Sequence, residues 1–431
     1  MRTRCSSQGP TGDGHPDTAA PTAIAGIATG SSLSDDVVYA VRIGDTLLAS
    51  AVDDGRGLWW GRGFDRRARP SRFGGLFSGP VGEAVFLGAL WRATGDERYR
   101  AAALRAAEPT VRSIEEGGGL RDALGLGGVA GFGSLVYGLD LVGASTAEPR
   151  VRGASLSAAE RLRAKAGETQ DLDVYWGMAG SILALLALEG GDSGDPLGAA
   201  LRLGEAVVER VSAVGSPLIG PGGAVQTTGF AHGSSGIGCA LVTLGRRTGV
   251  ALPVDVGLRL FSADRAAYSA AFGDWLDDPA DPDAPPWGAW CRGAAGIALS
   301  RLIALRDHGG VGLDDDDVGA ISLDLKRALT GTLRVGPSPP HTLCCGSLGR
   351  VDVLLLASET LGNPSLAERA RGLLRDVRDD AFAHLVEHPG ALLGPRGGLW
   401  QGAPGLGYML LRAADPAAFP SILSFAPFPR P

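Results

Sequence analysis

Seven segments of this 431-residue chain repeat one pattern, a Gly-x-x-Gly followed by an apolar run with helical spacing. The first glycines of the seven segments are Gly79, Gly128, Gly177, Gly233, Gly293, Gly346 and Gly402. Successive first glycines lie 49 to 60 residues apart, which leaves room for two helices in each repeat. Such regularity indicates a repeat architecture rather than a chance consequence of the 67 glycines in the chain.

The two helices of each repeat differ in character. The helix after each Gly-x-x-Gly is apolar on most faces, so it should be buried. Charged, amphipathic segments lie between these helices, and their expected starts carry polar caps such as Ser155 and Ser365. Four of them span residues 96–116, 155–166, 203–214 and 366–385. We therefore predict an all-α barrel over residues 31–425, with seven inner and seven outer helices, preceded by a flexible tail over residues 1–30.

The glycines predict where a functional site would form. A Gly-x-x-Gly at the start of an inner helix allows close backbone approach and leaves free N–H groups at the barrel mouth. All seven loops should gather at that end, so side chains next to the glycines should share one cavity. The glycine-rich stretch "ALGLGGVAG" could be mistaken for a dinucleotide-binding loop, but no predicted strand precedes it, and it fits the second repeat better.

Three of the five cysteines fall in these loops. Cys291 lies two residues before Gly293, and the adjacent pair Cys344 and Cys345 directly precedes Gly346. A disulfide within the pair would be strained, and one between Cys291 and the pair is disfavoured in a reducing compartment. The alternative is three small buried side chains. Their convergence favours a Zn²⁺ site with three thiolate ligands and an open fourth position, which is typical of catalytic zinc.

Two other residues lie in equivalent loops. His232 directly precedes Gly233, and Asp173 lies four residues before Gly177. We interpret them as catalytic candidates, with a satisfied core histidine as the alternative for His232. Cys239 lies within an inner helix and is predicted to be a small core residue.

Further motifs are weaker candidates for a functional site. His384 and His388 are four residues apart, but their order does not match H-E-x-x-H, and a solvated surface is the favoured interpretation. His341 lies near the cysteine pair in sequence and could contact the metal ligands without binding the metal itself. The acidic run 314–317 is expected to be a solvated helix start, favoured by the helix dipole.

Composition excludes several classes of function. The net charge of −7 argues against nucleic-acid binding through a basic surface. No apolar run is long enough for a transmembrane helix, and residues 1–22 lack the apolar core of a signal peptide. We expect a cytoplasmic protein, in which a close cysteine pair indicates metal binding or catalysis and Cys5 is incidental.

The motifs "WCRG", "CCG", "GFAHGSSGIG", "DVYWGMAG" and "GLWQGAPGLGYMLLR" resemble those of the lanthionine synthetase cyclase (LanC-like) family over residues 35–415. The resemblance implies an (α/α)7 toroid with one zinc ion. It also implies addition of a cysteine thiol of a precursor peptide to dehydroalanine or dehydrobutyrine, which forms lanthionine or methyllanthionine rings. The implied ligands are Cys291, Cys344 and Cys345.

This sequence departs from the family pattern at two positions. The family commonly has a Cys-His pair before the glycine, whereas this chain has Cys344-Cys345, as in some class II synthetases. We hypothesise that three thiolates leave a bound thiol more nucleophilic, which would make cyclisation faster and less selective. Trp287 stands where the family often has an arginine, so any contribution of that arginine must come from elsewhere.

The resemblance also implies roles and partners. His232 would supply or relay the proton to the α-carbon, and Asp173 would orient the histidine or the substrate. A separate dehydratase protein or domain would act first on the precursor. Alternatives are coupling of glutathione or another thiol to dehydrated residues, and a zinc-bearing peptide-binding protein without catalysis. Other α/α toroid enzymes fit less well: a glycosidase would want paired cavity carboxylates, and a zinc prenyltransferase would use an Asp-Cys-His ligand set.

Overall fold

The structure is a computed structural model, and everything said below refers to the residues that it describes. These are residues 34–60, 75–77, 79–117, 125–164, 169–188, 195–214, 228–278, 281–306, 311–337, 339–387 and 398–429. The predicted tail, residues 1–30, lies outside them, and the predicted domain extent of 31–425 stays a prediction.

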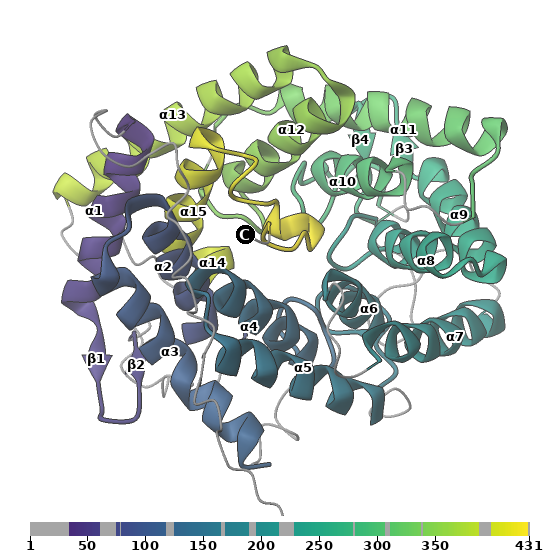
Figure 1. Ribbon diagram of the computed structural model, residues 1–431. Helices are drawn as coiled ribbons and strands as arrows, with labels where there is room; N and C mark the ends of the chain where they lie inside the picture. Colours follow the sequence, from purple (N-terminus) through teal and green to yellow (C-terminus); the bar gives the residue numbers. More distant parts are fainter. Residues whose placement is uncertain are drawn as a thin grey trace, which may run out of the picture.

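Seven helices form an inner ring around the centre of the molecule (Figure 1). They are α2 (Pro80–Thr94), α4 (Phe132–Thr146), α6 (Met178–Ala187), α8 (Ser234–Thr248), α10 (Ala294–Leu305), α12 (Ser347–Leu361) and α15 (Ala403–Ala414). Each packs against its neighbours in the ring, and α15 closes the ring by packing against α2.

Seven helices cover this ring on the outside (Figure 1). They are α1 (Asp35–Ser50), α3 (Glu97–Glu115), α5 (Pro149–Ala164), α7 (Pro196–Val214), α9 (Ala251–Ala266), α11 (Asp315–Arg334) and α13 (Pro364–Glu387). Each outer helix from α3 onward packs on the inner helix that directly precedes it in the sequence, and α1 packs on α15. Helix α1, the first helix of the described residues, therefore completes the seventh pair, and the predicted (α/α)7 toroid is confirmed.

The remaining elements are short. Two-residue strands form two antiparallel hairpins, β1 (Val52–Asp53) with β2 (Leu58–Trp59) and β3 (Tyr268–Ser269) with β4 (Asp274–Trp275). A short helix, α14 (Gly398–Gln401), precedes α15, and a 3₁₀ turn, η4 (Ile422–Ser424), follows it.

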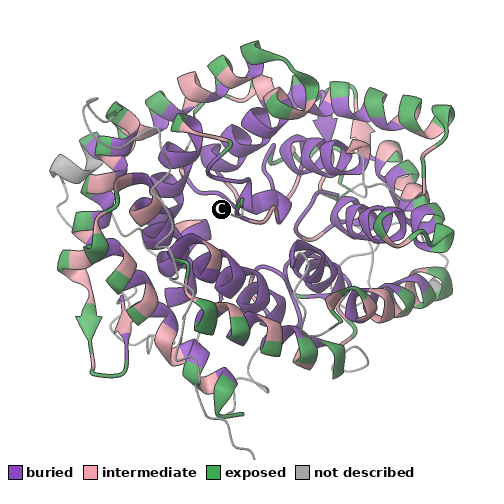
Figure 2. Ribbon diagram, in the orientation of Figure 1, coloured by how far each residue is buried: buried purple, intermediate pink, exposed green. Residues whose placement is uncertain are grey.

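Burial explains why the two layers have different sequences. All residues of α6 are buried, which matches its composition, apolar except for Ser181. In α3 the buried residues recur along one face, whereas charged residues face solvent. Figure 2 shows this contrast around the whole toroid, with buried inner helices and exposed outer surfaces. The apolar surface removed from water between the two layers stabilises the ring.

The structure corrects the second repeat. Helix α4 begins after Gly131, not after Gly128, so Gly131 is the equivalent of Gly177 and the other helix-preceding glycines. Gly128 instead lies in the loop, where its N–H bonds the carbonyl of Val174 at 3.0 Å. A Cβ at position 128 would lie 2.5 Å from the carbonyl oxygen of Gly180, so only glycine fits this close backbone approach.

Two predicted caps were wrong, and one helix start was right. Ser155 lies inside α5, where its buried hydroxyl donates to the carbonyl of Val136 at 2.7 Å. Asn363, not Ser365, caps α13, because its Oδ1 accepts from the N–H of Ser365 at 3.2 Å. The acidic run starts α11 as predicted, with Asp314 accepting from the N–H of Asp317.

The C-terminal segment folds back into the centre of the ring (Figure 1). Tyr137 of α4 donates to the carbonyl of Ala426 at 2.7 Å, and Tyr408 of α15 donates to that of Pro420 at 2.8 Å. The buried guanidinium of Arg412 bonds both Asp352, at 2.7 Å, and the carbonyl of Phe419, at 2.7 Å. These contacts tie residues 415–429 to α4 and α15, and Ser421 adds α12 by donating to Asp352 at 2.7 Å.

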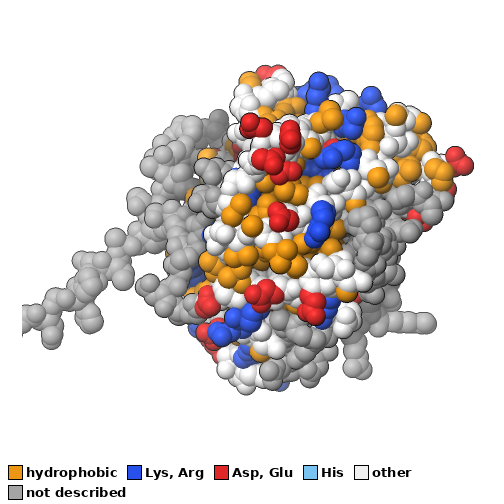
Figure 3. All heavy atoms as spheres, turned by 90° about the vertical axis from the view of Figure 1, so that its right-hand side faces the viewer, with side chains coloured by type: hydrophobic (Ala, Val, Ile, Leu, Met, Phe, Trp, Pro, Cys, Tyr) orange, Lys and Arg blue, Asp and Glu red, His pale blue; other side chains and the backbone are white. Residues whose placement is uncertain are grey.

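The outer surface mixes charges of both signs with apolar side chains, as Figure 3 shows for the right-hand side of Figure 1. Within the described residues, no helix combines the length and the apolar character that crossing a membrane requires.

Candidate metal centre and histidine–aspartate pair

In the loops before the inner helices, the position of a residue in the loop decides whether its side chain is exposed or buried. We call the glycine that directly precedes each inner helix the loop glycine, and the residue before it the mouth residue. Every described mouth residue is at least partly exposed: Ala130, Trp176, His232, Arg292, Cys345 and Gln401. The residue before the mouth residue is buried in six loops, at Val129, Tyr175, Ala231, Cys291, Cys344 and Trp400. One row of side chains therefore lines the mouth, and a second row lies beneath it.

Backbone hydrogen bonds join neighbouring loops. The N–H of Cys291 donates to the carbonyl of Cys344 at 3.2 Å, and that of Ala231 donates to the carbonyl of Cys291 at 3.3 Å. The carbonyl of Ala231 in turn accepts from Val174 and Tyr175, at 3.1 and 3.0 Å. Loops that are 50 or more residues apart in sequence are thereby held in one register.

The three predicted ligands form one cluster. The Sγ atom of Cys345 lies 3.5 Å from that of Cys291 and 3.3 Å from that of Cys344. All three sulfur atoms lie within 4.8 Å of one another. Cys291 and Cys344 are buried, whereas Cys345, a mouth residue, is partly exposed.

The cluster favours one negative charge on Cys345. Hydrogen bonds with Cys291 and Cys344, and to a smaller extent the charge of His232, lower the pKa of Cys345 to about 3. The pKa of Cys344 is raised well above its usual value by hydrogen bonds with Cys291 and Cys345 and by burial. The two neighbouring thiols thus favour a thiolate at Cys345.

The donor set fits zinc. A tetrahedral zinc with zinc–sulfur distances of about 2.3 Å separates its sulfur ligands by roughly 3.8 Å. The observed separations of 3.5 and 3.3 Å are close to this spacing. Three thiolates suit zinc better than a hard cation such as Mg²⁺, and they leave one tetrahedral position for a further ligand.

His232 and Asp173 form a pair beside this cluster. The Nδ1 atom of His232 lies 3.0 Å from Oδ2 of Asp173, and its imidazole is 20% exposed while the carboxylate is fully buried. The other oxygen, Oδ1, accepts from the N–H groups of Trp176 and Gly177 at 2.7 and 2.9 Å. With both oxygens held, the carboxylate can fix the orientation of the imidazole.

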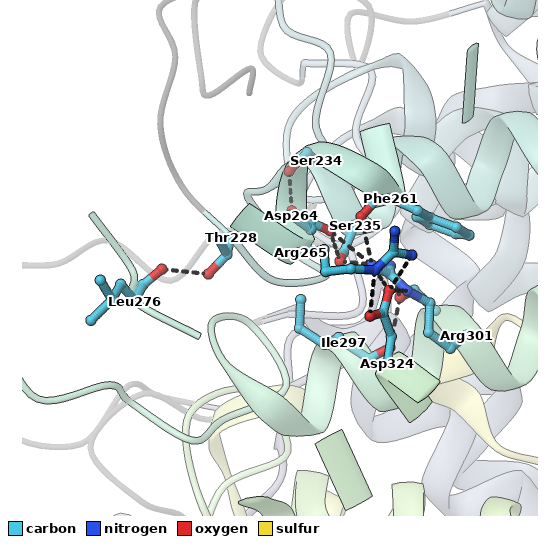
Figure 4. Close-up of polar contacts among 11 residues, drawn as sticks. Thr228, Ser234, Ser235, Phe261, Asp264, Arg265, Leu276, Ile297, Arg301 and Asp324 are labelled. Carbon is cyan, nitrogen blue, oxygen red and sulfur yellow. Dashed lines mark hydrogen bonds and ion pairs between the residues drawn. The ribbon is translucent and has the colours of Figure 1, made fainter. Parts of the chain in front are cut away.

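A buried polar network stabilises the helix that follows His232 (Figure 4). Ser234 and Ser235, the first residues of α8, both donate to the carboxylate of Asp264 on α9. Arg301 of α10 lies 3.5 Å from Asp264 and 3.4 Å from Asp324 of α11, and all three side chains are fully buried. The network therefore ties the start of α8 to three other helices.

Asp274 stabilises the start of the helix that follows Cys291. Its carboxylate is buried and accepts from the N–H groups of Trp275 and of Ala294, the first residue of α10. Burial raises the pKa of Asp274 to about 6, although these two hydrogen bonds oppose the shift. Gly293, between Cys291 and this helix, has a φ of 101°, a conformation that favours glycine.

The other candidates lie away from the cluster. His341 bonds Asp380 on α13 at 2.7 Å, rather than a cysteine. Cys239 is fully buried in α8 and burial raises its pKa to about 12, as expected for a core residue. The side chains of His384 and His388 lie outside the described residues.

Two mouth residues were missed by sequence reasoning. The side chain of Gln401 hydrogen-bonds to Cys345 and helps to lower the pKa of that thiol. Arg292 directly follows Cys291 and lies against Trp287 and Asp277. Their position directly before a loop glycine, shared with His232 and Cys345, is a signal that could have found both.

The chain matches a known protein family. A model of lanthionine synthetase C-like proteins matches residues 74–424. The chain therefore belongs to the lanthionine synthetase C-like family.

The structure of a solved cyclase shows the same architecture. The chain is similar to nisin cyclase, with a TM-score of 0.60 and 14% identity over 81% of this chain and 92% of that chain. It is also similar to an unsaturated glucuronyl hydrolase from Bacillus sp. GL1, with 17% identity over 70% of this chain and 85% of that chain. That second TM-score, 0.41, is too low to bear on function. No curated protein sequence matches the chain.

Proposed function

We propose that this protein is a zinc-dependent cyclase that forms thioether rings in a dehydrated peptide. The reaction adds a cysteine thiol of the peptide to a dehydroalanine or dehydrobutyrine of the same peptide, which gives lanthionine or methyllanthionine. The observation that carries this proposal is the cluster of three cysteine sulfurs within 4.8 Å, beside a histidine–aspartate pair. Membership of the lanthionine synthetase C-like family supports the same reaction.

Cys291, Cys344 and Cys345 are the residues that would hold the zinc ion. Zinc bound there would supply a positive charge that lowers the pKa of a substrate thiol, so that the thiol reacts as a thiolate near neutral pH. The partly exposed Cys345 lies on the mouth side of the cluster, so a peptide would approach from that side.

His232 would move the proton in this reaction. When the thiol sulfur bonds to the β-carbon of the dehydro residue, the electron pair of the Cα=Cβ bond shifts toward the adjacent carbonyl group. The α-carbon then takes up a proton. The contact between Nδ1 of His232 and Asp173 directs the other ring nitrogen, Nε2, to this exchange, and a histidine suits it at neutral pH.

The proposed chemistry defines the partners. The substrate is a precursor peptide whose serine and threonine residues have already been dehydrated, so a dehydratase, as a separate protein or domain, must act first. We propose that the reaction takes place in the cytoplasm, where free thiols persist.

Zinc analysis together with a ring-formation assay tests this proposal. We expect one zinc ion per chain, and loss of free thiol without a change in peptide mass when a dehydrated peptide is added. Zinc-loaded protein that leaves such peptides unchanged would contradict the cyclase proposal. A mass increase from added glutathione without ring formation would instead favour intermolecular thiol addition.

A further inference from the structure

The mouth residue of the fifth loop is a cation. Arg292 stands directly before Gly293, in the position that His232 and Cys345 occupy in their own loops. Its side chain is 32% exposed, so part of it is accessible to a molecule that approaches the mouth. A guanidinium keeps its charge at every physiological pH.

Two neighbours hold this guanidinium. The Nη1 atom of Arg292 lies 2.6 Å from Oδ2 of Asp277, whose side chain is 20% exposed. The Cζ atom lies 5.7 Å from the ring centroid of Trp287, the most exposed large apolar side chain in the described part of the chain, at 57%. An ion pair at one end and a ring against the plane restrict the rotation of the group, so its charge is preorganised.

Arg292 also lies beside the cysteine cluster, because it directly follows Cys291. The N–H of Ala231, the residue before His232, donates to the carbonyl of Cys291 at 3.3 Å, so the loops of Arg292 and His232 are neighbours. Two basic mouth residues thus stand in adjoining loops next to the cluster, and the proposed reaction moves negative charge from the sulfur atom toward the carbonyl group of the dehydro residue.

We propose that Arg292 is a catalytic residue that donates a hydrogen bond to the carbonyl oxygen of the dehydro residue, where negative charge develops during thiol addition. Trp287 and Asp277 are the positioning residues for this guanidinium. The inference rests on the proposed function. The step balances without an oxidant or reductant: the S–Cβ bond forms, the Cα=Cβ electron pair moves toward the carbonyl oxygen, and the α-carbon receives one proton.

A purely structural Arg292–Asp277 pair would behave differently. Partly exposed ion pairs typically contribute little to stability, so removal of a purely structural pair would barely change turnover. Removal of one donor to a developing negative charge typically lowers kcat about 10²- to 10³-fold. A structural role and a catalytic role of Arg292 therefore predict different decreases in kcat.

The experiment compares Arg292→Gln, Arg292→Lys and the control Arg105→Gln in the zinc-loaded protein. Arg105 forms a similar ion pair with Asp53, at 2.5 Å, on the outer surface. The measurements are kcat and KM for ring formation, zinc content, the thermal midpoint, and the dissociation constant of a fluorescent dehydrated peptide.

We expect Arg292→Gln to lower kcat about 10²-fold or more, while zinc content, thermal midpoint and peptide affinity stay near those of the unaltered protein. Arg292→Lys should recover part of the loss, because charge is kept but the planar fork is not. Arg105→Gln should match the unaltered protein. Trp287→Ala should lower kcat less, and should add little in an Arg292→Gln background.

A kcat for Arg292→Gln within about threefold of the unaltered protein would overturn this inference and leave the proposed function standing. A loss of zinc or of peptide binding that accounts for the fall in kcat would overturn it as well. An unaltered, zinc-loaded protein that is inactive on every dehydrated peptide would instead overturn the proposed function, and the role of Arg292 with it.

Discussion

The Nδ1 atom of His232 lies 3.0 Å from Oδ2 of Asp173, although 59 residues separate them in the chain. The contact joins the loop before α8 to the loop before α6. It depends on the hydrogen bonds of Val174 and Tyr175 to the carbonyl of Ala231, which align the two loops. The buried carboxylate thus acts on a ring that reaches the mouth of the toroid.

Replacement of His232 by alanine should remove the proton donor for the α-carbon. We expect kcat for ring formation to fall about 10²- to 10⁴-fold, with the zinc content unchanged because the three cysteines remain. Asp173→Asn should lower kcat less, since the imidazole stays but loses its fixed orientation. Steady-state kinetics with metal analysis measures both, and full activity of His232→Ala would contradict the role proposed for it.

Replacement of Cys344 by alanine should abolish zinc binding. Two thiolates cannot supply the three protein ligands that a catalytic zinc site has, so the zinc content should fall from one ion per chain to near zero. Cys239→Ala is the matched control, because this thiol is buried in α8 away from the cluster. Equal zinc contents in the two variants would show that the cysteine pair does not bind the metal.

The variant Cys345→His should cyclise more slowly and more selectively than the unaltered protein. Three thiolates donate more electron density than two thiolates and an imidazole, so the bound substrate thiol should be more nucleophilic in the unaltered site. The comparison uses a panel of dehydrated peptides and both proteins loaded with one zinc. A variant that is faster and equally permissive would refute the hypothesis.

Asp274 should make stability depend on pH between about 4 and 6. Its pKa in the folded protein is about 6, above its ordinary value of 3.8, so the folded state binds more protons in this range and stability falls as pH rises. The shift corresponds to about 3 kcal/mol. Chemical denaturation across this pH range should show that the free energy of unfolding falls less for Asp274→Asn than for the unaltered protein. Identical pH dependences of the two proteins would contradict the prediction.

Replacement of Asp264 by alanine should destabilise the fold. It removes the acceptor of Ser234 and Ser235 and one of the two carboxylates, Asp264 and Asp324, that pair with the buried Arg301. Breaking a buried ion pair by removing one partner typically costs about 3–5 kcal/mol. Asp53→Ala, which removes a partly exposed partner of Arg105, should cost at most about 1 kcal/mol, and denaturant titration compares the two.

The helices could be predicted from the sequence because their signals are local. An apolar run after a glycine pair indicates a buried helix wherever it occurs, and the charged segment of residues 96–116 shows the amphipathic pattern of α3. The repeat of these signals then required a closed ring. The exact start of α4 was not accessible in this way, because both Gly128 and Gly131 fit the pattern. Packing of Gly128 against Gly180 decides between them.

Contacts between segments that are distant in the sequence could not be predicted in this way. Ser155 looks like a helix cap by its sequence, but the carbonyl of Val136 on the neighbouring helix accepts its hydrogen bond inside α5. His341 lies near the cysteine pair in sequence, yet its partner is Asp380 on an outer helix. In both cases the partner comes from another part of the chain, and no local pattern specifies it.

The sequence by itself determined the seven repeats, the two layers of helices and the identity of the three clustered cysteines, because each of these follows from residue type and spacing. The tertiary structure decided which side chains share the mouth. The hydrogen bonds between loops set their register, and that register places Arg292 and Gln401 in the row of His232 and Cys345. Proximity of this kind depends on ring closure, which involves the whole chain at once.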